Sequence, residues 1–197
     1  MIANWRHNWG QGEFPFYYVQ LAGFNTNQTW WGGGEKNWVL LREAQLKTLS
    51  VPNTGMAVAS DIGDANDTHF KNKQEAGRRL ALWALAKTYN YNISCSGPSY
   101  KSMEVNRDRI ILHFDDEGKG FASRDGAELK GFTIAAADKK FYDATATIRG
   151  NVIEVLSKEV AKPAAVRYSW KDFPDANLCN KEGLPASQFR TDDWDEP

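Results

Sequence analysis

One stretch of the chain, with a strand, a polar loop and a helix in succession, constrains the fold more than any other. Residues 56–62 (MAVASDI) are small and apolar, which is typical of a strand buried in a parallel sheet. A polar loop follows over residues 63–70, and Asn72 with Glu75 has the spacing of a helix N-cap and its capping-box partner. Apolar residues then recur on one helical face: Ala76, Leu80, Trp83 and Ala84. This order of elements predicts an α/β fold.

The loop in the middle of this stretch carries three residues with acid–base chemistry. His69 follows Asp67 by two positions and Asp64 by five. In open α/β sheets the loops at the carboxyl ends of strands hold the chemistry, and a carboxylate beside an imidazole can orient a general base. These three residues are therefore candidate catalytic residues. The alternative is that His69 is an ordinary surface or capping residue of a polar loop.

The residues before this stretch predict more of the same α/β layer. A helix should end near Gly10, residues 14–21 (FPFYYVQL) predict a buried strand, and residues 38–49 (WVLLREAQLKTL) predict a helix. Within that second helix, Arg42 and Glu43 predict a surface or interdomain salt bridge. Together these elements make up half of a doubly wound α/β layer.

A glycine run separates the first strand from the second helix. Residues 23–37 contain Trp30 and Trp31 followed by three glycines, so regular structure cannot continue through them. A loop after a strand is where substrate-binding residues are often found. Trp30 and Trp31 are therefore candidates for a sugar-stacking platform, and the alternative is that they cap the hydrophobic core.

The second half of the chain, from residue 93 to 197, has a period-two pattern instead. Residues 109–114 (RIILHF) alternate in the manner of a strand, and residues 149–151 (RGN) predict a hairpin turn. Several short strands spaced in this way predict an antiparallel β-sandwich domain. From Asn177 onward we expect an irregular tail that packs back on the body.

Composition argues against several classes of partner and ligand. The formal net charge is −1 and no basic run interleaves with aromatic residues, which argues against nucleic acid and anionic membranes. No apolar run approaches the roughly 20 residues that span a bilayer. His7, His69 and His113 share no metal-ligand spacing, so no metal and no cofactor are expected. Cys95 and Cys179 can form one disulfide or remain free thiols.

Five stretches along the whole chain carry a resemblance to one enzyme family. They are MIANWRHNWGQGEFPFYYVQLAGF, WVLLREAQLKTLSVPNTGMAVA, TGMAVASDIGDANDTHFKNKQEAGRRLALWAL, LKGFTIAAADKKFYDAT and KEGLPASQFRTDDW. In the same order, they resemble the distal half of the bacterial sialate O-acetylesterases of the SGNH-hydrolase superfamily. The resemblance implies that residues 1–92 are the second half of a three-layer αβα SGNH-hydrolase-like domain, followed by the β-sandwich. It also suggests a periplasmic or secreted location.

The resemblance assigns roles to the residues of the polar loop. Family members are acyl hydrolases in which a Ser attacks an acetyl ester and a His is its base, and His69 matches that His. The superfamily pattern places an Asp three residues before the His, where this chain has Asn66. Asp67 is therefore the preferred orienting acid and Asp64 the second choice. A Ser–His dyad without an acid remains a further alternative.

The family's nucleophile block, a Gly-Gln-Ser-Asn-like turn, has no counterpart in these residues, nor has its Gly-Glu-Ser-Asn block. We therefore expect a carbohydrate O-acetylesterase whose Ser comes from an upstream portion or a partner chain, so that this chain alone is inactive. The expected partners are the upstream half of the esterase or a second copy of this chain, and an acetylated carbohydrate substrate. Sialic acid is the implied sugar, with xylan or other acetylated glycans left open. The alternative is a non-catalytic carbohydrate-binding or structural fragment.

Overall fold

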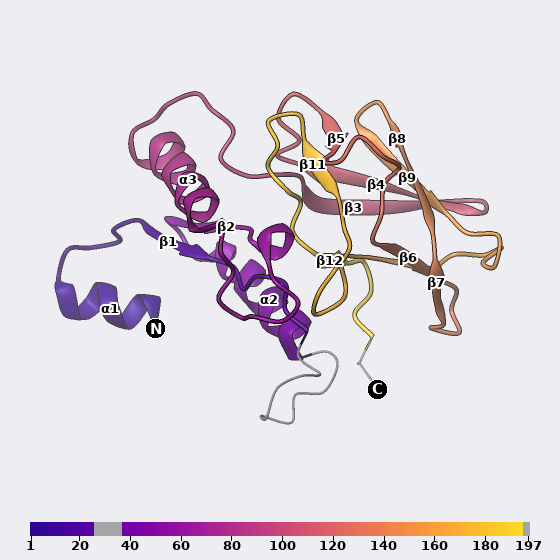
Figure 1. Ribbon diagram of the computed structural model, residues 1–197, viewed down its shortest axis with the longest axis horizontal. Coiled ribbons are helices and arrows are strands. Elements are labelled where there is room, and N and C mark those ends of the chain that lie inside the picture. Colours follow the sequence, from indigo (N-terminus) through magenta and orange to yellow (C-terminus); the bar gives the residue numbers. More distant parts are fainter. Residues whose placement is uncertain (26–36, 195–197) are drawn as a thin grey trace.

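The computed structural model describes residues 1–25 and 37–194, which form an α/β part followed by a β part (Figure 1). In the α/β part, strands β1 and β2 pair in parallel and form a two-stranded sheet. Among the described residues, no helix has the length and apolar character needed to cross a bilayer. The elements of this part are α1 (Ile2–Trp9), β1 (Phe16–Val19), α2 (Asn37–Lys47), the 3₁₀ turn η2 (Thr48–Ser50), β2 (Thr54–Ala57), the 3₁₀ turn η3 (Ser60–Ile62), α3 (Lys73–Trp83) and the π-helical η4 (Ala84–Thr88).

Capping interactions set the helix ends that the sequence predicts. α1 ends at Gly10, whose left-handed φ of 63° lets its N–H bond to the carbonyls of Arg6 and His7. α3 begins after Asn72, whose side chain accepts a hydrogen bond of 3.1 Å from the Glu75 N–H. The Glu75 carboxylate does not complete the predicted capping box, because it accepts hydrogen bonds from arginine side chains of its own helix.

The strand expected over residues 56–62 is shorter than the sequence suggests. β2 ends at Ala57, and the residues from Ser60 onward turn into η3. The reason lies at Val58, whose carbonyl oxygen accepts a hydrogen bond of 2.6 Å from the Arg79 guanidinium instead of pairing with a neighbouring strand. The apolar run is buried as predicted, but a helix side chain ends the strand.

α3 packs closely against the sheet because β2 carries a glycine beneath the helix. A Cβ added to Gly55 would lie 2.5 Å from the ring of Trp83. The Trp83 indole N–H donates to the Met56 carbonyl at 2.9 Å, so the ring is fixed in orientation as well as in position. This contact sets how near α3 lies to β2, and the polar loop between them must span that distance.

The β part contains two four-stranded sheets and one two-stranded pair, all antiparallel. The four-stranded sheets have the orders β3-β4-β9-β8 and β12-β10-β6-β7, and β5 pairs with β11. The predicted hairpin joins β8 to β9, with Gly150 at a φ of 63° in its turn. The strands are β3 (Ser99–Asn106), β4 (Arg109–Asp115), β5 (Phe121–Ser123), β6 (Phe132–Ala135), β7 (Phe141–Asp143), β8 (Thr145–Arg149), β9 (Val152–Leu156), β10 (Ala165–Tyr168), β11 (Leu178–Asn180) and β12 (Phe189–Arg190).

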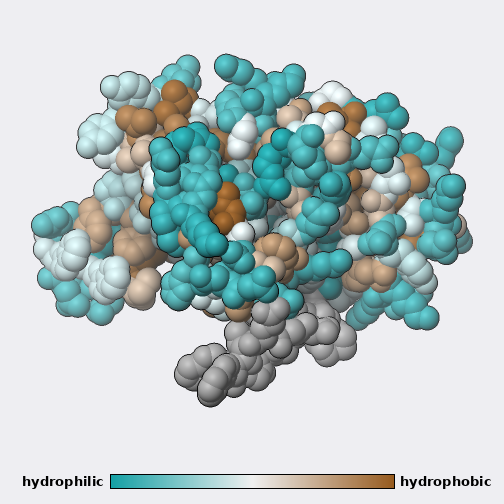
Figure 2. Space-filling view, viewed as in Figure 1, coloured by the Kyte–Doolittle hydropathy of each residue, from teal (hydrophilic) through white to brown (hydrophobic). Residues whose placement is uncertain are grey.

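The buried side chains of both large sheets meet in one hydrophobic core. Every second residue of β4 and β9 points into it, as the period-two pattern predicts. In Figure 2 hydrophilic side chains cover most of the face shown, and hydrophobic ones gather in small patches between them. The most deeply buried core residues of the two sheets are Ile110, Leu112, Ile134, Ile153, Val155 and Val166.

The C-terminal tail is more regular than expected. It contributes two short strands, β11 and β12, between stretches without regular structure. Leu178, Ala186 and Phe189 of this tail belong to the hydrophobic core, so it packs back on the body. The Phe189 ring stacks on Tyr100 of β3 with ring centroids 4.8 Å apart. Two- and three-residue strands lack the length for a period-two signal, which is why the sequence pattern did not show them.

Both cysteines are free thiols, which decides between the two alternatives left by the sequence. Cys179 is buried on β11 and Cys95 is partly buried after η4. Burial is the main cause that raises the pKa of each thiol above its ordinary value. Both groups are therefore in the protonated form at neutral pH.

α2 joins the two parts of the molecule through a buried arginine. Arg42 is fully buried, and its guanidinium donates to Gln188 Oε1 at 2.7 Å and to the Asp172 carbonyl at 3.1 Å. Burial lowers the Arg42 pKa to about 10. The neighbouring Glu43 pairs with Arg190 of β12 at 2.8 Å. The expected salt bridge thus forms between the two parts through Glu43, while Arg42 is a buried anchor.

Candidate functional site

The loops that follow β1 and β2 lie at the same edge of the small sheet, because parallel strands end on the same side. Gly23 and Gly63 touch backbone to backbone, and any side chain on Gly63 would collide with the first loop. The expected sugar platform, Trp30 and Trp31, follows Gly23 in sequence and lies outside the described residues. The polar loop after β2 therefore packs directly against the loop after β1.

Within the polar loop, the structure brings His69 and Asp67 together. His69 Nδ1 lies 3.1 Å from Asp67 Oδ1, and the same oxygen accepts a hydrogen bond of 2.8 Å from the His69 backbone N–H. The Thr68 hydroxyl also lies 3.3 Å from Nδ1. Both side chains are accessible, with exposed fractions of 86% for His69 and 50% for Asp67. An Nδ1–H that donates to a carboxylate leaves Nε2 as the basic nitrogen of the ring.

The carboxylate of this pair is electrostatically adapted to staying ionised. Hydrogen bonds from His69, the backbone N–H first and the ring second, hold the pKa of Asp67 below its ordinary value. Asp67 is therefore ionised throughout the neutral pH range, and its carboxylate can accept the hydrogen bond from the His69 ring at every pH in that range. The arrangement can orient an imidazole and stabilise its positive charge after it has taken up a proton.

Asp64 has a different place in the loop. Its Oδ1 accepts a hydrogen bond of 2.9 Å from the Asn66 backbone N–H, which is an Asx turn. No hydrogen bond links Asp64 to His69 within the part of the chain that the structure describes. Of the two candidate acids, Asp67 is the one that lies next to His69. Nor do the residues of ranges 1–25 and 37–194 contain a group of three His, Cys, Asp or Glu side chains that could hold a metal ion.

Sequence reasoning missed a buried ionic network beneath this loop. Arg79 of α3 and Asp61 are each only 5% exposed and form a two-bond pair, at 2.6 and 2.8 Å. Arg79 also bonds to Glu75 at 2.8 Å, and Arg124 of the β part reaches Asp61 at 3.1 Å. One signal was available in the sequence, because Arg79 falls on the otherwise apolar face of the predicted helix.

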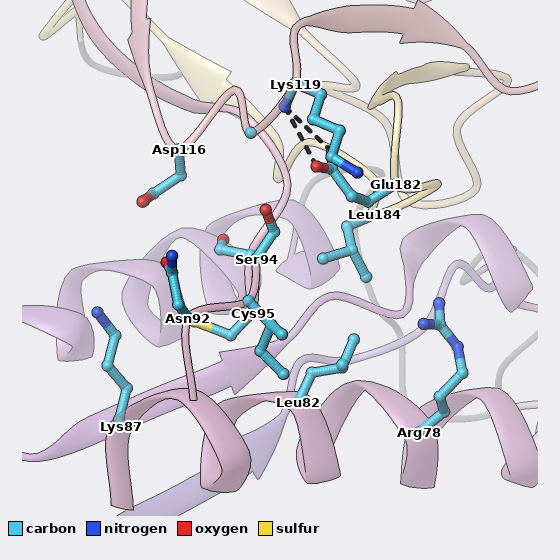
Figure 3. A pocket seen from close by; sticks show the side chains of 13 residues that line it. Arg78, Leu82, Lys87, Asn92, Ser94, Cys95, Asp116, Lys119, Glu182 and Leu184 are labelled. Atoms are coloured by element: carbon cyan, nitrogen blue, oxygen red, sulfur yellow. Dashed lines mark hydrogen bonds between the residues drawn. The ribbon is translucent and has the colours of Figure 1, made fainter. Parts of the chain in front are cut away.

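A separate cavity of about 690 Å³ lies between the two parts of the molecule. Figure 3 shows Lys87 of η4 on one side of it and Asp116 and Lys119, from the loop between β4 and β5, on the other. Glu182 closes one end and accepts a hydrogen bond from the Lys119 backbone N–H at 3.2 Å. Burial raises the pKa of Asp116. His69 is not among the residues that line this cavity.

The chain is similar to part of a solved enzyme structure. No family model and no curated protein matches the chain. Among solved structures, the crystal structure of a novel carbohydrate acetylesterase from Xanthomonas citri matches 98% of this chain at 43% sequence identity and a TM-score of 0.92. The chain is related to a carbohydrate acetylesterase. It spans 45% of the length of that acetylesterase, so the match is to part of a larger protein.

Proposed function

We propose that this chain is the part of a carbohydrate O-acetylesterase that carries the general base, His69. The observation that carries the proposal is the 3.1 Å contact between His69 Nδ1 and Asp67 in a loop at the carboxyl end of a parallel strand. The relation to a carbohydrate acetylesterase supports the reaction class, and the sequence resemblance supports sialic acid as the sugar. Asp67 is the proposed orienting acid, ahead of Asp64.

The proposed reaction transfers the acetyl group twice. A Ser hydroxyl oxygen from outside this chain bonds to the acetyl carbonyl carbon, and its proton moves to Nε2 of His69. The bond between that carbon and the sugar oxygen breaks, and His69 returns the proton to the leaving alkoxide. Water then attacks the acetyl-serine in the same way and releases acetate. Throughout, the Asp67 carboxylate accepts the Nδ1–H bond and fixes the tautomer that leaves Nε2 as the base.

The same proposal includes a domain arrangement and a partner. Residues 1–92 would be the second half of a three-layer αβα SGNH-hydrolase-like domain, and residues 93–197 a separate β-sandwich domain. A parallel sheet of two strands is far smaller than usual, and β1 pairs only with β2 among the described residues. Trp9 and Leu41 are exposed on the same part of the molecule. The upstream half of the esterase, or a second copy of this chain, would complete the sheet beside β1.

The test is to assay this chain alone and together with the upstream polypeptide that carries the Ser. A fluorophosphonate probe, read by intact-protein mass spectrometry, should label the Ser of the upstream polypeptide. His69→Ala should then lower the deacetylation rate constant of the assembled enzyme by about 10³-fold or more. His113→Ala, at a partly exposed position of β4, is the matched control and should change the rate little. Near-normal turnover in His69→Ala would refute His69 as the general base. A label on a Ser of this chain would refute the placement of the nucleophile outside it.

A second candidate function is non-catalytic carbohydrate binding. The observation that favours it is the cavity between the two parts, because Asn92, Ser94 and Asp116 line it with groups that hydrogen-bond to sugar hydroxyls. Titration of the chain alone with acetylated and de-acetylated oligosaccharides, followed by NMR, distinguishes the two functions. Binding at this cavity without any dependence on acetyl groups or on His69 would favour the second.

A further inference from the structure

Arg79 connects the two ends of the segment that carries His69. Its guanidinium donates to both carboxylate oxygens of Asp61, which precedes the polar loop, at 2.6 and 2.8 Å. Its Nε donates to Glu75, in the first turn of α3 after the loop, at 2.8 Å. The fourth bond, of 2.6 Å, goes to the carbonyl of Val58, the residue directly after β2. One buried side chain therefore holds the residue that follows the strand, the entry to the loop and its exit.

Among the described residues, few hydrogen bonds join the polar loop to other segments. The side-chain hydrogen bonds described inside it join near neighbours, such as Asn66 to Asp64 and His69 to Asp67. One backbone bond, from the Asn25 N–H to the Ala65 carbonyl at 3.2 Å, ties the loop to its neighbour. Bonds of this local kind shape a turn, but they do not determine where the turn lies relative to the sheet. That placement depends on the contact between Gly63 and Gly23 and on the anchors at the two ends of the loop.

The β part supplies the remaining arm of the anchor. Arg124, directly after β5, lies 3.1 Å from Asp61 Oδ2 and also reaches the Asp61 carbonyl at 3.5 Å. The Asp61 carboxylate is thus shared by two guanidinium groups, one from each part of the molecule. Unlike Arg79, the Arg124 side chain is 43% exposed, so it contributes a weaker contact.

We infer that Arg79 is a positioning residue for His69: by clamping Asp61 to Glu75 it fixes the loop in which the imidazole meets Asp67. The inference rests on the proposed function of His69 for its catalytic meaning, but its structural content can be tested on this chain alone. In the assembled esterase, loss of the clamp should lower kcat by about 10²-fold, the cost of displacing a catalytic group by about 1 Å, with little change in KM.

The decisive readout is the tautomer of the His69 ring, measured by long-range ¹H–¹⁵N NMR at a pH where the ring is neutral. In the unmodified chain we expect the Nδ1–H form, because Nδ1 donates to Asp67. In Arg79→Gln we expect a shift toward the tautomer mixture of His7, because a loop released at its ends also populates turns in which Asp67 does not meet the ring. His7 is exposed on α1 and serves as internal reference. Arg78→Gln is the matched control, because Arg78 binds Glu75 at 2.7 Å but does not contact Asp61 in the described network.

Loss of folding is separated from loss of positioning by two further variants. Asp61→Asn and Glu75→Gln keep the side-chain shape and each opens one end of the clamp, so both should shift the His69 tautomer, and amide exchange over residues 63–70 should rise. The inference is wrong if Arg79→Gln folds and retains the Nδ1–H tautomer. Should Arg79→Gln fail to fold, retention of that tautomer in Asp61→Asn and Glu75→Gln would show the same. Near-normal turnover in His69→Ala would refute the proposed function instead, and would leave the clamp in place.

Discussion

The α/β part and the β part are each stabilised by a different kind of interaction. The β part has a continuous hydrophobic core to which both large sheets contribute. In the α/β part each helix is anchored by a buried arginine, Arg6 in α1, Arg42 in α2 and Arg79 in α3. All three donate to backbone carbonyls of other segments, and Arg79 also to carboxylates. Hydrophobic burial adds up over many residues, whereas these anchors are single and directional.

This difference indicates where the molecule is vulnerable. A core built from many apolar contacts loses a part of its stability with each truncation. Substitution of a buried arginine removes the donor of several buried acceptors at once, and the lost stability falls on the one helix that carries it. We therefore expect single substitutions, and acid, to loosen the α/β part before they affect the β part.

The largest effect should come from Arg42, the anchor between the two parts. Arg42→Ala leaves Gln188 Oε1 and the Asp172 carbonyl without this buried donor, and the expected loss is about 3–5 kcal/mol of the free energy of unfolding. Urea titration followed by hydrogen exchange should show the α/β part unfolding at lower urea than the β part. The control is Arg109→Ala on β4, whose ion pairs with Asp108 and Glu154 lie at the surface, so its effect on stability should be much smaller. If Arg42→Ala lost less unfolding free energy than the control, the arginine anchors would not be the weak points of the α/β part.

Periodicity and capping rules predicted the elements of the fold but not the interactions that join them. The helix ends at Gly10 and Asn72, and the hairpin at residues 149–151, follow from local chemistry and were predicted. The early end of β2 at Ala57 was not, because it depends on Arg79, a residue distant in sequence. At the candidate site, the sequence spacing predicts that His69 and Asp67 lie close together, and in the structure they do, because both residues lie in one turn.

A second prediction concerns the contact that seats α3 on the sheet. Gly55→Ala places a Cβ 2.5 Å from the Trp83 ring, and the ring is held by its bond to the Met56 carbonyl. The strain should cost about 1–3 kcal/mol, as overpacking usually does. Trp fluorescence and urea unfolding measure it. Gly77→Ala is the control, because its Cβ would meet open space in the middle of α3, and it should be neutral or stabilising. Equal stability of the two variants would show that α3 can move away from β2.

The smallest effect tests whether the ionic anchors make the α/β part sensitive to acid. Hydrogen bonds from Arg78, and then from Arg79, lower the pKa of Glu75 to about 2 from an ordinary value of 4.5. Because the folded state lowers this pKa, the stabilisation from the ionised Glu75 is complete above about pH 5 and is lost as the pH falls through 4.5 toward 2.

Comparing Glu75→Gln with the unmodified chain isolates this contribution from those of other acids. The difference in unfolding free energy should shrink by about 1 kcal/mol between pH 6 and pH 3, with amide exchange of α3 rising while that of β4 and β9 stays constant. A uniform loss of protection in both parts would mean that acid acts on the whole molecule, and that the clamp around Arg79 is no weaker than the hydrophobic core.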